Sequence, residues 1–190
     1  MSLKELSFRL YPSNVSNWIE LVNKNIIDIG CGPHKFLIYS NHDKMIENNE
    51  VISVDYGNYV KPSIPNYFKA DAYHLPFITS HFDFAILSRV CSSDISRLNV
   101  FSEKIERHVL KQVLRPLYSN DLSKILKEVN RILKNGGFIY LEVNTGWCND
   151  RKRNHVKTTY VNALGNYGFN VLAISLLSDL YIIAQKMKSI

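Results

Sequence analysis

The chain has 190 residues, of which 46% are hydrophobic and 21% charged, so we expect one domain over residues 1–190 with a single core. No run approaches the roughly 20 apolar residues that span a bilayer and no signal peptide opens the chain, so we expect a cytoplasmic protein without a membrane segment. The net charge of +6 permits an anionic partner, whereas three cysteines (Cys31, Cys91 and Cys148) without a Cys-x-x-Cys pair predict neither a disulfide framework nor a structural metal.

The first predicted elements are a helix over residues 13–24 and a strand over residues 26–29. The helix rests on apolar side chains at near-helical spacing. The strand is apolar on both faces except for Asp28, as expected of a central parallel strand covered by helices. Gly30 and Gly32 follow it, and their missing Cβ atoms would let a ligand lie against the main chain.

Strands and helices then alternate along the chain. We expect a helix over residues 36–48, a β-branched strand over 51–55, a short strand over 67–71 and a further strand over 82–87. The strands over 51–55 and 67–71 both end in an aspartate. Strand–helix–strand units of this kind form parallel sheets with right-handed crossovers.

The second half of the chain continues the pattern. A basic amphipathic helix is predicted over residues 95–115, and an apolar stripe predicts another helix over 121–133, with Gly136 just past its end. A strand over 138–143 precedes a polar loop over 145–153.

The last predicted elements are a helix over residues 156–166 and two apolar runs, 170–176 and 180–185, that form an antiparallel hairpin. The chain therefore predicts an α/β fold. We expect a Rossmann-like three-layer sandwich whose mostly parallel, seven-stranded sheet ends in this C-terminal hairpin.

Candidate functional residues gather where the parallel strands end. Ligands of such sheets lie beyond the carboxyl ends of the strands. The residues at those ends are Gly30, Gly32, Asp55, Asp71 and Ser88.

The spacing of these residues favours an adenosyl cofactor. Asp55 follows the glycines by about 20 to 25 residues, which is where an acid accepts hydrogen bonds from a ribose diol. A dinucleotide fingerprint needs a third glycine, but Lys35 stands at that position. Asp28 is an acid inside an apolar strand, and orienting the glycine loop or binding a cationic ligand would account for its burial.

At this point the sequence resembles the class I S-adenosylmethionine-dependent methyltransferases of the small-molecule, type 11-like subgroup. The resemblance extends from residue 25 to residue 185 and rests on four motifs in order. They are Asp28-Ile29-Gly30-Cys31-Gly32-Pro33, Val54-Asp55-Tyr56, Lys69-Ala70-Asp71-Ala72 with Leu75-Pro76-Phe77 and Phe82-Asp83, and the segment from Glu128 to Gly137.

The resemblance implies S-adenosyl-L-methionine as the cofactor and a set of residues that bind it. The glycines would contact the methionine portion, Asp55 would hold the ribose hydroxyls and Tyr56 would cover the adenine. Asp71 would accept from the adenine amino group beside the Ala72 N–H, and the Ser88 carbonyl would face the ammonium. The full set is Asp28, Gly30, Cys31, Gly32, Asp55, Tyr56, Asp71, Ala72 and Ser88.

Two departures from the family leave the catalytic residues unknown. His34 replaces a frequent third glycine, and Ser92-Ser93 stands where many members carry Glu-His. His155 is a candidate general base, although a solvated histidine is the commoner role for such a residue. Methyl transfer from a sulfonium depends mainly on positioning, so no base is strictly required.

Three functions stay open from the sequence. The first is a methyltransferase with a small-molecule acceptor. The second is a nucleic-acid (RNA) methyltransferase, suggested by Arg151-Lys152-Arg153 with His155 and Lys157, although short charge runs are usually solvated. The third is a non-catalytic S-adenosylmethionine-binding protein, which the absent Glu-His would allow. The sequence does not indicate an oligomeric state.

Overall fold

In this computed structural model the described parts of the chain carry the expected sheet. They are residues 7–8, 19–20, 23–31, 49–56, 66–88, 90, 122–143, 145, 150–176 and 179–188.

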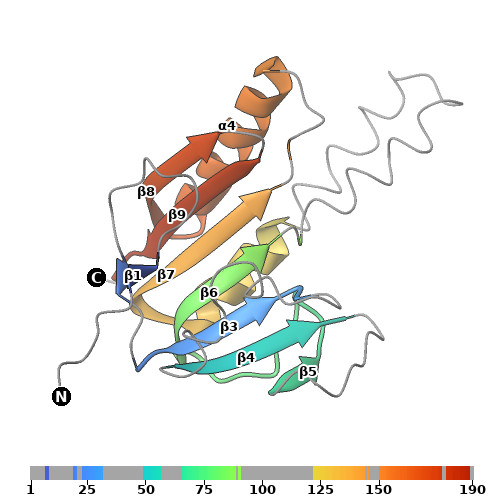
Figure 1. The fold of residues 1–190 in the computed structure, drawn as a ribbon, viewed down its shortest axis with the longest axis vertical. Helices are drawn as coiled ribbons and strands as arrows, with labels where there is room; N and C mark the ends of the chain where they lie inside the picture. Colours follow the sequence, from blue (N-terminus) through green and yellow to red (C-terminus); the bar gives the residue numbers. More distant parts are fainter. Residues whose placement is uncertain are drawn as a thin grey trace, which may run out of the picture.

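A seven-stranded sheet with the order β5-β4-β3-β6-β7-β9-β8 organises these residues (Figure 1). Strands β5, β4, β3, β6 and β7 pair in parallel, whereas β9 is antiparallel to both β7 and β8. This confirms the Rossmann-like α/β fold and its C-terminal hairpin. The strands are β3 (Asn25–Ile29), β4 (Glu50–Asp55), β5 (Tyr67–Lys69), β6 (Phe82–Ser88), β7 (Leu133–Val143), β8 (Phe169–Leu176) and β9 (Leu180–Lys186).

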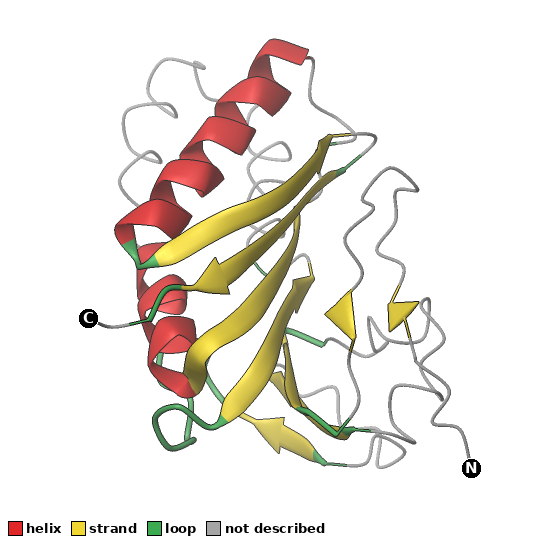
Figure 2. Ribbon diagram, turned by 90° about the vertical axis from the view of Figure 1, so that its left-hand side faces the viewer, coloured by secondary structure: helices red, strands yellow, loops and turns green. Residues whose placement is uncertain are grey.

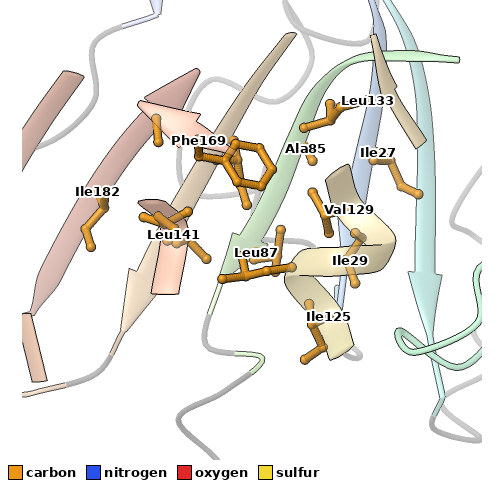
Figure 3. Packing of buried hydrophobic residues seen from close by; sticks show 14 of the residues in the cluster. Ile27, Ile29, Ala85, Leu87, Ile125, Val129, Leu133, Leu141, Phe169 and Ile182 are labelled. Carbon is orange, nitrogen blue, oxygen red and sulfur yellow. The ribbon is translucent and has the colours of Figure 1, made fainter. Parts of the chain in front are cut away.

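The central strands are buried on both faces, which explains their uninterrupted apolar sequences. Ile27 and Ile29 point toward a core that also contains Ile125 and Val129 from the helix above the sheet (Figure 3). Ile26 belongs to a second buried cluster on the opposite face, because successive side chains of a strand alternate between faces. A two-sided core of this kind holds the carboxyl ends of β3, β4 and β6 at one edge.

Two described helices cover the same face of the sheet (Figure 2). Residues 122–132 are helical, and α4 spans Asp150–Asn166. The helices predicted over 36–48 and 95–115 lie outside the described residues. Within the described part of the chain, neither helix has the length and hydropathy to cross a bilayer.

The helix predicted over residues 13–24 is wrong at its C-terminal half. Strand β2 (Ile19–Glu20) pairs antiparallel with β1 (Ser7–Phe8), and Asn23 has a φ of 54°. Both features are incompatible with a continuous right-handed helix. Tertiary pairing therefore overrides the apolar periodicity of this segment.

Strand β7 begins at Leu133, five residues earlier than expected. Leu133 pairs with Phe82 and Phe138 pairs with Phe84, so residues 134–137 form an inserted turn within the strand. Gly136 makes this possible with a φ of 79°, which other residues rarely adopt. The expected placement of Gly136 beyond the helix end is correct. Residues of β7 on both sides of Gly136 pair with β6, so the glycine lies within the strand and not ahead of it.

Two further boundaries differ from the prediction. Helix α4 begins at Asp150 and not at residue 156. The sequence pattern predicts too late a start because the first turns contain no apolar residue and so carry no periodic signal. An ion pair of 3.8 Å between Arg153 Nη1 and Asp150 Oδ1 spans its first turn. Strand β5 ends at Lys69, whereas Asp71 forms an isolated bridge with His74 in the turn that follows.

Candidate functional site

The glycine turn folds the end of β3 against β4. The N–H groups of Gly30 and Cys31 both donate to the carbonyl of Val54, at 2.7 and 3.2 Å. Gly30 has a φ of 72°, and a Cβ at this position would overlap Val90 Cγ2. Only glycine fits both the backbone angle and the space. Gly32, the second glycine of the motif, lies outside the described residues.

Asp55 ends β4 directly beside this turn. Its backbone carbonyl accepts hydrogen bonds from Ala70 N at 3.1 Å and from the Tyr67 hydroxyl at 3.4 Å. Burial, followed by the nearby Asp55 carboxylate and Cys31 thiol, raises the pKa of Tyr67 above its ordinary value. The ends of β3, β4 and β5 therefore meet around these side chains, and Tyr56 projects beyond them with 75% of its surface exposed.

Asp71 anchors a short turn over residues 71–74, here called the Asp71 turn. Its carboxylate Oδ1 accepts from Tyr73 N at 2.9 Å, and its carbonyl accepts from His74 N at 3.0 Å. Its Oδ2 lies 4.0 Å from His74 Nδ1, and the Asp71 side chain is 44% exposed. Ala72 lies within this turn, one residue from the carboxylate expected to read an adenine ring.

Two other predicted residues occupy β3 and β6. Asp28 is fully buried in the middle of β3, in register with Ser53 of β4 and Ile86 of β6. Ser88 ends β6 at the same edge, since Leu87 pairs with Ile29 immediately before the glycine turn. The structure therefore brings the described members of the predicted set to one edge of the sheet, except Asp28, which lies inside β3, two residues before Gly30.

The chemistry of this edge fits an adenosyl cofactor. The carboxylates of Asp55 and Asp71 are acceptors suited to ribose hydroxyls and to an exocyclic amine. Gly30, with its positive φ and no Cβ, turns the chain sharply at the end of strand β3. The individual contacts expected for these residues stay predictions.

Sequence reasoning missed two residues that bind the main chain just after the Asp71 turn. Glu128 accepts from Leu75 N at 2.9 Å, and Arg131 donates to the carbonyls of Leu75 and Phe77 at 2.9 and 2.7 Å. Glu128 and Arg131 lie three residues apart on the helix over 122–132, on one face. That spacing signals an ion pair, but no local pattern reveals which carbonyls it binds.

The basic segment lies on a helix and not in the expected loop. Arg151 is exposed in the first turn of α4, whereas Arg153 donates through Nε to the Thr145 carbonyl at 3.4 Å. His155 is exposed as well. Since α4 follows β7, this helix end lies toward the carboxyl edge of the sheet (Figure 1).

Comparisons with known proteins agree with this geometry. A family model described as a methyltransferase domain matches residues 27–141, more than half of the chain. No curated protein sequence matches significantly.

Solved structures of similar fold include several methyltransferases. An S-adenosylmethionine-dependent methyltransferase from Methanosarcina mazei is 20% identical with a TM-score of 0.64, over 95% of this chain and 99% of its own. The aminoglycoside resistance methyltransferase NpmB1 is 20% identical with a TM-score of 0.57, over 88% of this chain and 89% of its own. The [4+2]-cyclase SpnF is 12% identical with a TM-score of 0.58, over 88% of this chain and 76% of its own.

Proposed function

Because this chain belongs to the class I S-adenosylmethionine-dependent methyltransferases, we propose that it methylates a small molecule and binds its cofactor at the carboxyl edge of β3, β4 and β5. The cofactor supplies an activated methyl group, so the protein has to bind, orient and exclude water from the reactants.

The pair of hydrogen bonds accepted by the Val54 carbonyl is the main observation that supports the proposed cofactor site. It accepts from both Gly30 N and Cys31 N, and Asp55 is the next residue along the chain. The glycine turn and the acid are thereby locked together. In the proposal, the turn offers its main chain to the methionine portion while the Asp55 carboxylate accepts from the ribose hydroxyls.

The other predicted residues complete the proposed site. Tyr56, largely exposed at the end of β4, covers the adenine, and Asp71 with the Ala72 N–H reads its edge. The Ser88 carbonyl at the end of β6 accepts from the cofactor ammonium. Asp28 supports the glycine turn from within β3.

A small-molecule acceptor is supported by the state of the basic segment. Arg153 is already engaged with Thr145 and Asp150, so it is less available to a phosphate backbone than the sequence suggests. A nucleic-acid acceptor is the second candidate, and the exposed Arg151 at the start of α4 is the observation that favours it.

Two measurements test the proposal in sequence. Calorimetry should detect binding of S-adenosylhomocysteine and no comparable binding of NAD; tighter binding of NAD would overturn the cofactor site. Transfer of labelled methyl from S-adenosylmethionine should then be measured with separate pools of small metabolites and of RNA. Labelling of the RNA pool alone would replace the small-molecule acceptor. A cytoplasmic location and a single domain over 1–190 stay predictions.

A further inference from the structure

Among the ties between the β5–β6 segment and the helix over 122–132 is an ion pair, here called the Glu128–Arg131 pair. Arg131 donates from Nε to Glu128 Oε2 at 2.9 Å and from Nη2 to Glu128 Oε1 at 2.6 Å. This bidentate geometry is the strongest that these groups form. Accordingly, the pair lowers the pKa of Glu128 and raises that of Arg131.

The pair holds one residue of the segment from both sides. Glu128 Oε1 accepts from Leu75 N, and Arg131 Nη2 donates to the Leu75 carbonyl. Arg131 Nη1 also donates to the Phe77 carbonyl, and the backbone carbonyl of Arg131 accepts from Ser80 N at 2.9 Å. Leu75 itself is buried. The main chain at Leu75 can therefore shift only if these charge-assisted bonds break.

The Asp71 turn lies between two residues whose main chain is fixed, Ala70 and Leu75. On one side, Ala70 N is bound to the Asp55 carbonyl at the end of β4. On the other side, Leu75 follows the turn without an intervening residue. A third tie comes from Lys124, whose ammonium lies 5.3 Å from the centre of the Tyr73 ring. The position of the Asp71 carboxylate thus depends on the helix as well as on the sheet.

We propose that Glu128 and Arg131 are positioning residues for cofactor recognition: they hold the Asp71 turn so that Asp71 and the Ala72 N–H read the edge of the adenine ring. The inference rests on the proposed function and goes beyond it. Neither side chain belongs to the proposed cofactor contacts: Glu128 acts through the main chain of Leu75, and Arg131 acts through that of Leu75 and Phe77. Loss of either side chain should reduce the selectivity for the adenine base more than it reduces the affinity for the cofactor.

The adenine edge offers a selective readout of this role. Adenine presents an amino donor beside a ring-nitrogen acceptor, which complements a carboxylate beside a backbone N–H. Hypoxanthine presents a carbonyl and a ring N–H instead, so the pattern is inverted. The parent protein should therefore prefer S-adenosylhomocysteine over S-inosylhomocysteine by about ten- to a hundredfold, the usual range for a hydrogen bond to a charged group.

The experiment measures this preference by calorimetry in the full chain. Arg131→Met removes the guanidinium at similar length and should reduce the preference to roughly threefold or less, because a charge-assisted contact is lost. Arg131→Lys keeps a cation but lacks the planar fork that pairs bidentately with Glu128 while reaching two carbonyls, and should fall in between. Asp71→Ala should abolish the preference, which shows that Asp71 is its source.

Lys134→Met is the matched control, because Lys134 makes an ion pair of 2.8 Å with Asp83 near the same helix end but does not touch the segment. It should keep the full preference. If Arg131→Met does not fold, Glu128→Gln serves in its place, since a glutamine oxygen can still accept from Leu75 N.

Each other outcome overturns the inference. A folded Arg131→Met with the parent's preference would show that the pair is only structural, and an equal loss in Lys134→Met would show general loosening. A parent that binds S-adenosylhomocysteine without preference contradicts base reading by Asp71 and leaves the cofactor site standing. A parent that binds neither nucleoside contradicts the proposed function itself.

Discussion

Asp55 combines a structural group with a group of proposed function in one residue. Its backbone carbonyl binds Ala70 N and the Tyr67 hydroxyl, which joins β4 to β5. Its carboxylate is the acceptor proposed for the ribose. A side-chain substitution leaves the backbone bonds intact, so the two tasks can be separated by mutation.

Asp55→Ala should weaken binding of S-adenosylhomocysteine by roughly ten- to a hundredfold, because removing a charged acceptor costs on the order of 1.5 to 3 kcal/mol. Glu50→Ala is the control, since Glu50 is an exposed acid at the opposite end of the same strand. Calorimetry of both variants measures the difference. Equal affinities in Asp55→Ala and the parent would place the ribose elsewhere.

Gly30→Ala should destabilise the fold by about 1 kcal/mol or more and weaken cofactor binding, because its φ is positive and its Cβ would overlap Val90. Gly165→Ala is the matched control: Gly165 lies in α4 with no atom within 4 Å of an added Cβ, so alanine should be neutral or stabilising. Urea unfolding measures both changes. Equal stability of the two variants would argue against strain at Gly30.

At the scale of elements, the C-terminal end of the helix over 122–132 is bound by side chains and main chain from other parts of the chain. Lys186 of β9 is buried, and its ammonium donates to the carbonyls of Asn130 and Leu133 at 2.7 and 2.8 Å. Burial lowers the pKa of Lys186. Ser80 and His81 bind two further carbonyls of the same helix end. This end is therefore held by β9 and by the chain entering β6, which fixes the Glu128–Arg131 pair relative to the sheet.

Lys186→Met should lower the free energy of unfolding by roughly 1 to 3 kcal/mol, because two carbonyls lose their donor inside the protein. Lys188→Met makes the same change at an exposed position and should have little effect. Chemical unfolding of the two variants provides the comparison. An unchanged Lys186→Met would mean that other donors take over the helix end.

The Glu128–Arg131 pair should also shape the acid stability of the protein. Arg131 lowers the pKa of Glu128 in the folded state, so the unfolded state binds more protons at acidic pH. The pair's contribution to the free energy of unfolding is therefore complete above about pH 4.5, the ordinary pKa of a glutamate. It is lost as the pH falls through the lowered pKa. Glu128→Gln should therefore flatten the decline of unfolding free energy below pH 4.5. Parallel curves for parent and variant would count against this contribution.

At the scale of the whole molecule, the two candidate acceptors differ in the positive charge that they require from the protein surface. The net charge of +6 is spread over the chain, and one basic cluster opens α4 at the carboxyl edge of the sheet. A phosphate backbone would need several of these cations at once, whereas a neutral small molecule would need none.

Replacing Arg151, Lys152 and Arg153 together with alanine tests this distinction. With a small-molecule acceptor, the triple variant should bind the cofactor and turn over like the parent. With RNA or DNA, its acceptor affinity and the slope of that affinity against salt should both fall, because fewer counterions are released. A salt titration measures this. A charge-matched control removes three lysines elsewhere: the half-buried Lys24 and the exposed Lys127 and Lys188.

The sequence by itself predicted the order of the strands along the chain and the edge of the sheet at which we propose that the cofactor binds. The apolar runs that became β3, β4, β6 and the C-terminal hairpin are local signals, because burial on both faces demands continuous β-branched or aromatic side chains. The glycine turn after β3 and the acid ending β4 followed from the same pattern.

Only the tertiary structure decided the pairing of β1 with β2 and the early starts of β7 and α4. It also decided the polar ties: Lys186 reaches carbonyls more than 50 residues away, and Arg131 reaches Leu75 across a similar separation. Such bonds depend on which backbone groups the packed sheet and helices leave without a partner of their own. Local spacing contains no record of those groups, so the partners of Lys186 and Arg131 follow only from the folded chain.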